Sequence, residues 1–530
     1  MRWRVSASPA VAKAVRMKRI LSAVSVALLL FMTGCASLPP PKDRLETAAL
    51  TDTAGTRLGR SIAPGITANP GKTGIHRLPD PRDAFAARVL LADAAEKSLD
   101  VQYFIWHGDH VGYLLFQALW QAAERGVRVR VLLDDLNTKG LDPTIATLDA
   151  HPNIEVRLYN PVVNRDHRTL NFVTDFSRVN RRMHNKSFTA DNQASVVGGR
   201  NVADEYFGAG TGLTFADLDV LATGPVVSEV SREFDIYWNS ASAYPASGFV
   251  GPPMADGIAK LEAKFTANGA DPESISYVET VRTTRVMRDL LDRRLALEWT
   301  AAEVLYDDPA KTLDTEGRKD VLLLPELIRK MGRPERQLDI VSPYFVPGDG
   351  GTELLASVAK RGVTVRILTN SLAASDEKSV HSGYAKRRRE LLEAGVRLYE
   401  IKPIATKEES ESHSRFGSGS SSGLHAKTLA VDSERIFVGS FNFDQRSAHL
   451  NTEMGVVLSK PVLAQGLTRF FDVEVPMLAY EVRLAPDGKS LEWVERTASG
   501  EKRYDTEPET HWSRRMGVWL LSILPIEWLL

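Results

Sequence analysis

The chain has 530 residues, which is enough for two or more domains that each bury a hydrophobic core. Its 66 basic and 67 acidic residues give a formal net charge of -1, and this balance argues against a protein whose main task is to coat nucleic acid. Hydrophobic residues make up 43% and charged residues 25%, as in an ordinary globular protein.

The first 34 residues have the pattern of a signal peptide. A basic region precedes the apolar run ILSAVSVALLLFM (20–32), which is too short to cross a membrane comfortably. Cys35, the only cysteine in the chain, follows in a context that resembles a bacterial lipobox, so we expect this thiol to carry a lipid. Alternatives are an ordinary signal anchor with an incidental cysteine, and a true start at Met17.

Lipidation would place the folded body in the bacterial cell envelope, anchored by lipid and facing the periplasm. Ala36, rather than an aspartate, follows the cysteine, and this favours the outer membrane over the inner membrane. Residues 35–80 are rich in Pro, Gly, Thr and Ala, so we expect a flexible tether there.

The remaining chain contains an internal duplication, with apolar β-branched runs alternating with helical patterns. The matching segments are SLDVQYFIW (98–106) with QLDIVSPYFV (337–346), LLFQALWQAAERGVRVRVLLD (114–134) with LLASVAKRGVTVRILTN (354–370), and NIEVRLYNP (153–161) with GVRLYEIKP (395–403). Each copy predicts an α/β domain, a mixed β-sheet flanked by helices, and the two domains are expected to pack about a pseudo-twofold axis.

The duplication also suggests domain boundaries. We expect an N-terminal domain over 81–250, a helical connector over 251–335 and a C-terminal domain over 336–480. Residues 481–530 are expected to form a hairpin and an amphipathic segment at a membrane interface, because Trp512, Trp519 and Trp528 lie near basic residues in a short apolar run. A terminal helix packed on its own domain is the alternative.

Each copy ends in a polar motif: RMHNKSFTADNQASVVGGRN (182–201) and LHAKTLAVDSERIFVGSFN (424–442). Both have histidine, lysine two residues later, aspartate at +7, glycine at +14 and asparagine at +17. The residues are His184, Lys186, Asp191 and Asn201 in the first copy, and His425, Lys427, Asp432, Ser440 and Asn442 in the second. Because alternate residues of a strand share one face, a β-hairpin would gather these polar groups into one pocket, shared by both domains.

This set of groups suits cleavage of a phosphodiester without a metal ion or cofactor. One neutral imidazole can attack phosphorus while a protonated one donates to the leaving oxygen. Lys186 and Lys427 supply positive charge, and Asn201, Asn442 and Ser440 can donate hydrogen bonds to phosphoryl oxygens. We expect His184 to be the nucleophile and His425 the general acid and then base, although the pseudosymmetry leaves the reverse assignment open.

Acidic residues are expected to support both histidines. Asp217 and Glu453 occupy equivalent positions after the two motifs, and we assign Asp217 to orient His184 and Glu453 to orient His425. Asp191 and Asp432 belong to the catalytic motifs but lie on the opposite strand face, so they are expected to bond locally and to shape the motif.

Two H-x-K-x4-D motifs inside a duplicated α/β unit resemble the phospholipase D superfamily over roughly residues 80–480. DVQYFIW, DFSRVNRRMHNKSF, VGGRNVADEYFGAG and the terminal LPIEWLL are similar to bacterial cardiolipin synthases of the C type. This resemblance implies two phospholipase D-type domains with one active site, a phosphohistidine intermediate and phosphatidyl transfer. The lipobox is a departure from the pattern of these synthases.

The resulting hypothesis is a phosphatidyltransferase that forms cardiolipin from phosphatidylglycerol and a second phospholipid, possible donors including phosphatidylethanolamine. Its expected partners are these lipids and the membrane surface, and no nucleic acid is expected. The alternatives are a phospholipase D that releases phosphatidic acid, a periplasmic nuclease or phosphodiesterase, and a catalytically inactive lipid-binding scaffold.

Overall fold

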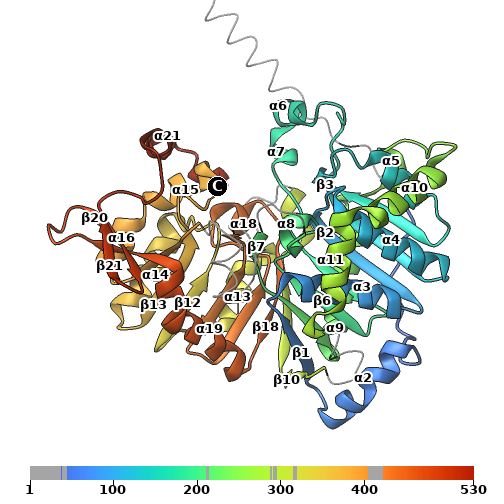
Figure 1. Ribbon diagram of the computed structural model, residues 1–530, viewed down its shortest axis with the longest axis horizontal. Helices are drawn as coiled ribbons and strands as arrows, with labels where there is room; N and C mark the ends of the chain where they lie inside the picture. The colour runs from blue at the N-terminus through green and yellow to red at the C-terminus, as the bar shows by residue number, and fades with distance from the viewer. Residues whose placement is uncertain are drawn as a thin grey trace, which may run out of the picture.

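Two α/β halves lie side by side in the computed structural model of the chain (Figure 1). The structure describes residues 38, 44–209, 214–286, 289, 295–313, 319–375, 377–403 and 422–530. Residues 1–34, expected to be a signal peptide, and Cys35, expected to carry a lipid, lie outside these described residues.

The first half is built on a nine-stranded mixed sheet. In spatial order its strands are β10 (Glu298–Thr300), β1 (Thr73–Leu78), β8 (Asp219–Thr223), β6 (Ala194–Gly198), β5 (Ser187–Ala190), β2 (Ser98–Ile105), β3 (Arg128–Asn137), β4 (Ile154–Tyr159) and β9 (Ala243–Pro245). Strands β2, β3 and β4 run parallel, whereas β5 pairs with β2 in the antiparallel sense.

The second half repeats this arrangement in a ten-stranded sheet. Its spatial order is β11 (Ala302–Tyr306), β18 (Met454–Leu458), β17 (Arg435–Gly439), β16 (Lys427–Val431), β12 (Gln337–Val341), β13 (Thr364–Asn370), β14 (Arg397–Ile401), β19 (Ala479–Leu484), β20 (Leu491–Thr497) and β21 (Gly500–Tyr504). Strands β12, β13 and β14 are parallel and β16 is antiparallel to β12. The mixed-sheet duplication predicted from the sequence is therefore confirmed.

Helices surround both sheets, most of them packed on the sheet faces. In the first half they are α2 (Arg57–Ala68), α3 (Pro81–Ala94), α4 (His110–Glu124), α5 (Asp142–Asp149), α6 (Asn171–Thr174), α7 (Phe176–Val179), α8 (Asp204–Phe207), α9 (Pro225–Trp238), α10 (Gly257–Ala270) and α11 (Pro272–Arg282). In the second half they are α13 (Leu323–Met331), α14 (Gly348–Lys360), α15 (Lys378–Ala385), α16 (Arg388–Glu393), α18 (Gln445–His449), α19 (Pro461–Val473), α20 (Val475–Leu478) and α21 (Trp512–Ile523). Short 3-10 turns are η1 (Arg168–Leu170), η2 (Ala246–Gly248), η3 (Pro309–Leu313), η4 (Lys319–Val321) and η5 (Glu527–Leu529).

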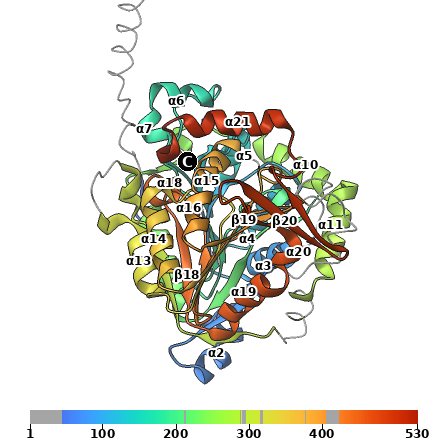
Figure 2. The ribbon, with the colours of Figure 1, turned by 90° about the vertical axis from the view of Figure 1, so that its left-hand side faces the viewer.

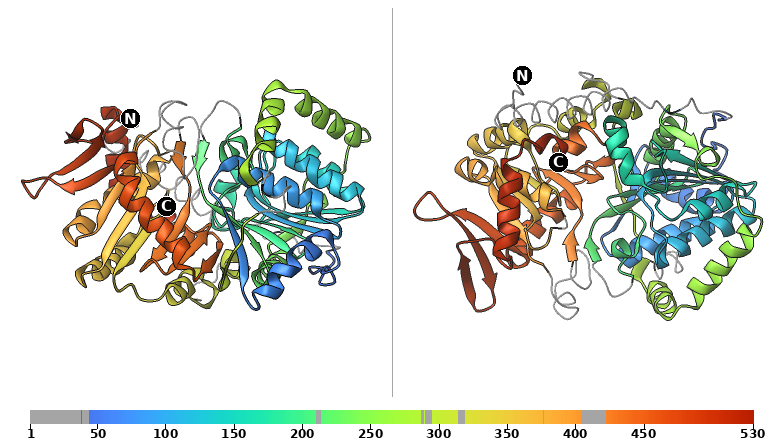
Figure 3. Two further views of the ribbon diagram at one scale, coloured as in Figure 1. Left: turned by 60° about the horizontal axis from the view of Figure 1, so that its bottom comes forward. Right: turned by 90° about the horizontal axis from the view of Figure 1, so that it is seen from above.

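The two halves share one hydrophobic core at the seam between them. Val197 and Val220 of the first sheet belong to the same buried cluster as Val438 and Val456 of the second. Strands β6 and β8 contact β17 directly, and Figure 3 shows the halves side by side along this seam. Because apolar surface removed from water stabilises an interface roughly in proportion to its area, this core holds the halves in one fixed arrangement.

The structure differs from the flexible tether expected over 35–80. Residues 57–68 form α2, and 73–78 form β1 inside the first sheet. The Thr56 side chain accepts the Gly59 N–H and so caps the helix, and α2 tolerates Pro64. An ideal Cβ at Gly65 would lie 2.5 Å from the Trp299 ring, so this segment packs closely on the first half instead of hanging free.

The connector expected over 251–335 is not wholly helical. After α10 and α11, the chain contributes β10 to the edge of the first sheet and β11 to the edge of the second. Expected hairpin strands in the last fifty residues are present as β19, β20 and β21. Among the described residues, none of the helices is both long and apolar enough to cross a membrane.

Candidate active site

The two polar motifs form the β-hairpins expected from their alternation. Strand β5 pairs with β6 and β16 pairs with β17, with Lys427 directly opposite Gly439. An ideal Cβ at Gly439 would lie 2.4 Å from the Met454 carbonyl oxygen, and one at Gly198 would lie 2.1 Å from Asp219 Oδ1. The motif glycine is therefore needed because the neighbouring strand leaves no room for a side chain.

The two histidines lie at the seam, and each is held by a carboxylate from the opposite half. His184 Nδ1 is 2.8 Å from Glu453 Oε2, and His425 Nδ1 is 2.6 Å from Asp217 Oδ2. The predicted assignment of Asp217 to His184 and of Glu453 to His425 is therefore wrong, although both acids do hold a histidine. In this arrangement Nδ1–H donates to the carboxylate and leaves Nε2 of each ring for chemistry.

Backbone pairing across the seam explains the crossed arrangement. His184 N donates to Thr452 O at 2.9 Å, and Glu453 is the next residue along that chain. In the other motif, His425 N donates to Ala216 O at 2.8 Å, and Asp217 follows. Each histidine segment is thus bound to the other half's backbone, a relation that alignment of the two copies could not reveal.

The two carboxylates have different surroundings. Glu453 accepts hydrogen bonds from the hydroxyls of Ser440 and Ser447. The single O–H of Ser440 is thus donated to Glu453, and the hydrogen bond expected from Ser440 to a phosphoryl oxygen stays a prediction. At the position equivalent to Ser440, an ideal Cβ on Gly199 would lie 2.2 Å from Asp217 Oδ1, so the shorter carboxylate occupies the space that the serine fills in the other copy.

Burial and charge set the protonation of the site. Burial, followed by Lys186 and Lys427, holds the pKa of His184 well below its usual range, and burial and Lys427 lower the pKa of His425 to about 3. Both imidazoles are therefore neutral near pH 7. An anionic phosphodiester between them would raise both pKa values, since a nearby negative charge favours the protonated ring.

The other ionisable groups respond to the same burial. Burial lowers the pKa of Lys186 and raises that of Glu453 to about 7. Burial opposes ionisation of Asp217, but His425 and Lys427 outweigh it and hold the pKa of that carboxyl below its usual range. Burial thus disfavours the charged form of Lys186, and an incoming phosphate would favour it.

The motif aspartates bond locally, as expected. Asp191 accepts the backbone N–H groups of Glu96, Lys97 and Ser98, and Asp432 accepts those of Glu335, Arg336 and Gln337. Both aspartates have positive φ, 51° and 53°, at the turn of the hairpin. Each aspartate therefore binds its hairpin to the start of the neighbouring strand, β2 in the first half and β12 in the second, instead of facing the histidines.

Each motif asparagine is buried beside the site and has one side-chain polar atom without a hydrogen-bond partner among the described residues. Asn201 Oδ1 accepts the Ile105 N–H at 3.2 Å, while its Nδ2 has no hydrogen-bond partner among the described residues. Asn442 Oδ1 is likewise unpaired within the described part of the chain. A buried polar atom without a partner costs free energy unless a ligand satisfies it. The Asn201 Nδ2–H group is therefore suited to donate to a phosphoryl oxygen, whereas Asn442 Oδ1 is an acceptor and suits a donor such as a substrate hydroxyl.

Aromatic rings that the motif analysis did not single out pack against the histidines. Phe104 lies edge-on to His184 with 4.8 Å between ring centroids, and Lys186 Nζ is 5.4 Å from the Phe104 centroid. Tyr206 and Phe215 pack on His425 at 5.0 and 5.3 Å. These rings fix the imidazole planes and exclude water, and Phe104 could have been suspected from its place in the repeated DVQYFIW segment.

A buried ion pair from the connector lies behind Glu453. Asp307 accepts the backbone N–H of Glu453 at 2.8 Å and pairs with Lys311 Nζ at 2.9 Å. Lys311 is 2% exposed and also donates to the Ser447 carbonyl at 2.8 Å. No pattern in the sequence marked this pair, because the segment was interpreted only as a connector.

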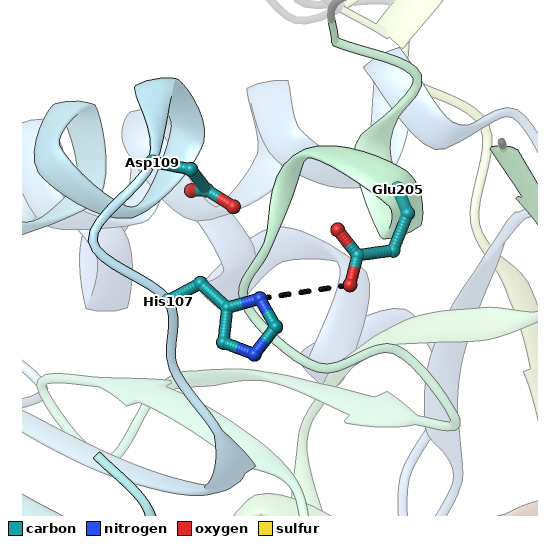
Figure 4. A group of neighbouring side chains, drawn as sticks. All are labelled: His107, Asp109 and Glu205. Atoms are coloured by element: carbon teal, nitrogen blue, oxygen red, sulfur yellow. Dashed lines mark ion pairs between the residues drawn. The ribbon is translucent and has the colours of Figure 1, made fainter. Parts of the chain in front are cut away.

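One group in the described part of the chain has the composition of a cation site. Ligand atoms of His107, Asp109 and Glu205 lie within 4.8 Å of one another, with His107 and Glu205 facing across a loop (Figure 4). The Asp109 carboxylate already accepts the N–H groups of Gly112 and Asp204, which caps α4 and fixes α8. These bonds give the cluster a structural role on the first half.

Comparison with known proteins relates most of the chain to a cardiolipin synthase. It is 46% identical over 476 residues to cardiolipin synthase C of Escherichia coli, covering 89% of this chain and 100% of that protein. An uncharacterized protein of Helicobacter pylori is 32% identical over 82% of this chain and 86% of its own length. The crystal structure of phosphatidylserine synthase from Haemophilus influenzae shares the fold, with a TM-score of 0.50 and 14% identity over 80% of this chain and 91% of that one.

These relatives correct the predicted localisation. The N-terminal pattern was interpreted as a lipid anchor facing the periplasm, with the outer membrane favoured. The relative that is matched over 100% of its own length is described as a cardiolipin synthase, and that description gives no support for an outer-membrane lipoprotein. The localisation inferred from the lipobox is therefore wrong.

The family profile described as "Cardiolipin synthase, PLD-like domain" matches residues 90–238 and 327–474, one match in each half. These two segments contain both histidine motifs and both carboxylates that hold the histidines. Together with the 46% identity over most of the chain, the match agrees with the duplicated mixed-sheet fold. The chain belongs to the cardiolipin synthase family of the phospholipase D superfamily.

Proposed function

We propose that this chain is a phosphatidyltransferase that forms cardiolipin from phosphatidylglycerol and a second phospholipid. The observation that carries the proposal is the pair of crossed histidine–carboxylate contacts, with two lysines, in one buried seam. The relative that is matched over 100% of its own length is a cardiolipin synthase, and this similarity supports a phospholipid as the substrate class.

In the first step, Nε2 of His184 attacks the phosphorus of the donor lipid. The anionic substrate raises the pKa of His425, so that this ring is protonated on both nitrogens when the substrate is bound. The bond between phosphorus and the headgroup oxygen breaks, and the His425 imidazolium gives its Nε2 proton to that oxygen as the alcohol leaves. Lys186 and Lys427 offset the charge on the phosphoryl oxygens, and the unpaired Asn201 amide donates a hydrogen bond. The product is a phosphatidyl group bonded to His184.

In the second step, a primary hydroxyl of phosphatidylglycerol attacks the phosphorus of the phosphohistidine. The now neutral His425 accepts the hydroxyl proton, the phosphorus–nitrogen bond breaks, and cardiolipin leaves. The aromatic rings on both imidazoles restrict water, which favours transfer over hydrolysis. If phosphatidylglycerol is also the donor, the released alcohol is glycerol; with phosphatidylethanolamine it is ethanolamine.

The surroundings of His184 support its assignment as the nucleophile. Glu453 accepts hydrogen bonds from the Ser440 and Ser447 hydroxyls as well as from His184 Nδ1–H. The carboxylate that orients His184 is therefore itself fixed by two further bonds. A nucleophile must keep one orientation through both steps, whereas the acid and base partner exchanges a proton twice. The lipid substrates also make a membrane surface the expected partner of the enzyme.

The test is mass spectrometry of lipids after incubation of the purified chain, with EDTA, in vesicles of phosphatidylglycerol and phosphatidylethanolamine. We expect cardiolipin with the wild type and none with His184→Ala. The released alcohol identifies the donor. With His425→Ala and a donor that has a good leaving group, quenching in denaturant at neutral to alkaline pH, where a phosphohistidine bond survives, should leave a phosphatidyl group on His184 that peptide mass detects.

Other outcomes would contradict specific parts of the proposal. Phosphatidic acid without cardiolipin would make the enzyme a phospholipase D. An adduct on His425 in the His184→Ala variant would reverse the two roles. No lipid change under any of these conditions would refute the lipid substrate and leave a nuclease or an inactive scaffold.

A further inference from the structure

Two patches of large apolar side chains are exposed on the described surface. The C-terminal patch comprises Trp512, Trp519 and Ile523 of α21 with the following Trp528, which are 57–61% exposed. The N-terminal patch comprises Val163, Leu170, Val173 and Phe176 around η1, α6 and α7, which are 42–60% exposed. Contiguous exposed apolar surface is rare on soluble proteins and usually marks a site of interaction.

The two patches come from different halves but lie on one side of the molecule. Helices α6 and α7 stand above the first half, and α21 stands above the second, in both perpendicular views (Figures 1 and 2). Helix α19 lies toward the opposite end in both views. One flat partner could therefore contact both patches at once.

A direct chain of contacts connects both patches to the segment that carries His184. Arg446 Nη1 donates to Asn180 Oδ1 at 2.8 Å and to the Leu529 carbonyl at 3.3 Å. Asn180 follows α7 of the N-terminal patch, and Leu529 adjoins Trp528 of the C-terminal patch. The partner that covers the patches would thus lie over the part of the seam that holds the nucleophile.

Cations lie beside the tryptophans of the C-terminal patch. Arg514 and Arg515 are half-buried on α21, and Lys386 is exposed with its Nζ 3.4 Å from the Leu524 carbonyl. The nearby Glu527 is already paired with Arg387. Tryptophan next to arginine and lysine on a short helix suits the headgroup level of a bilayer, where the rings contact acyl chains and the cations meet anionic phosphates.

We propose that the N-terminal and C-terminal patches together dock on the surface of an anionic lipid bilayer, so that the molecule rests on both halves and the seam faces the membrane. The inference rests on the proposed function, because it names the surface from which the lipid substrates would reach the histidines. Contact at two points fixes the tilt of the molecule, which one amphipathic helix alone does not.

The experiment is flotation of the full chain with vesicles of phosphatidylcholine, with and without phosphatidylglycerol. One variant carries Trp512→Ser and Trp519→Ser, and a second carries Val173→Ser and Phe176→Ser. The matched control carries Val462→Ser and Val473→Ser on α19, which are 53% and 59% exposed on the other side. Circular dichroism and thermal unfolding establish that each variant is folded.

We expect binding that rises with phosphatidylglycerol and falls with salt. Each patch variant should bind about tenfold more weakly, the combined variant should bind more weakly than either, and the α19 control should bind as the wild type does. His184→Ala should bind normally, so loss of catalysis and loss of docking are distinguishable. Hydrolysis of a water-soluble short-chain phosphodiester should be unchanged in the patch variants.

Three outcomes would overturn the inference. Flotation that neither patch variant changes would exclude docking through these surfaces. Flotation that depends on α21 alone would exclude contact at two points. A concentration-dependent dimer without lipid, abolished by the same substitutions, would mean that a second copy of the chain covers the patches.

Discussion

Replacing Lys311 by methionine removes the cation behind one active-site carboxylate and keeps most of the side-chain volume. In the structure, Lys311 neutralises Asp307, which lies against the backbone of Glu453. Burial raises the pKa of Asp307 to about 6 and that of Glu453 to about 7. Without Lys311, two buried carboxyls share one region, and ionising both becomes more costly.

Magnitudes follow from burial and charge. Breaking a buried pair by removing one partner costs about 3–5 kcal/mol of unfolding free energy. At an effective dielectric of about 20, two charges about 8 Å apart interact by about 2 kcal/mol, or about 1.5 pKa units. The folded-state pKa of Glu453 is already raised, and loss of Lys311 raises it further. Its ionised form is then lost at higher pH than in the wild type.

The assay is the pH dependence of kcat/KM for transfer. We expect the acidic limb for Lys311→Met to move up by about one to two pH units, since His184 needs an ionised partner. Adding Asp307→Asn removes the uncompensated carboxylate and should move the limb back toward the wild type. A fixed acidic limb, combined with a loss of stability like that of Arg366→Met, would refute this reasoning; Arg366 is a buried arginine paired with Asp339 and Asp472.

Three further predictions test the site and its frame. Gly199→Ala places a Cβ 2.2 Å from Asp217 Oδ1 and should lower kcat by about a hundredfold or more, while Gly248→Ala, with open space around it, should not. Asp191→Asn weakens charge-assisted bonds to three backbone N–H groups, so urea unfolding should show a loss of about 2 kcal/mol with kcat of the folded enzyme nearly unchanged; a selective loss of kcat would give Asp191 a chemical role. Burial raises the pKa of Glu233 to about 8, so its contribution to stability is present below about pH 4.5 and is lost as the pH rises through 8; Glu233→Gln should therefore stabilise the fold at pH 9 relative to the wild type but not at pH 5, measured by thermal unfolding.

The repeated fold was predictable because it depends on local patterns. Alternating apolar runs and paired His-x-Lys motifs specify strands and hairpins, and the hairpin of Lys427 opposite Gly439 follows directly from that alternation. Local bonding of Asp191 and Asp432 followed from the same strand geometry. These features require only neighbours along the chain or across one turn.

Contacts across the seam were not predictable from one half. Aligning the copies paired Asp217 with His184, but the backbone bond from His184 to Thr452 brings Glu453 there instead. The helix around Pro64 formed despite an unfavourable composition because it packs against Trp299, an example of tertiary contacts overriding propensity. The role of Lys311 was not predictable for a similar reason: its ion-pair partner Asp307 is four residues away, but Ser447 and Glu453, which the pair contacts, are distant in the sequence.

Because each histidine is held by a carboxylate of the other half, neither half is catalytically competent on its own. A fragment carrying His184 lacks Glu453, and a fragment carrying His425 lacks Asp217, so neither could orient its own imidazole. Each fragment would also expose the apolar side of its sheet at Val197 or Val438. During synthesis, the active site therefore forms only when the strands of the second half pack against those of the first. A nascent chain is thereby kept from attacking lipids until it is whole.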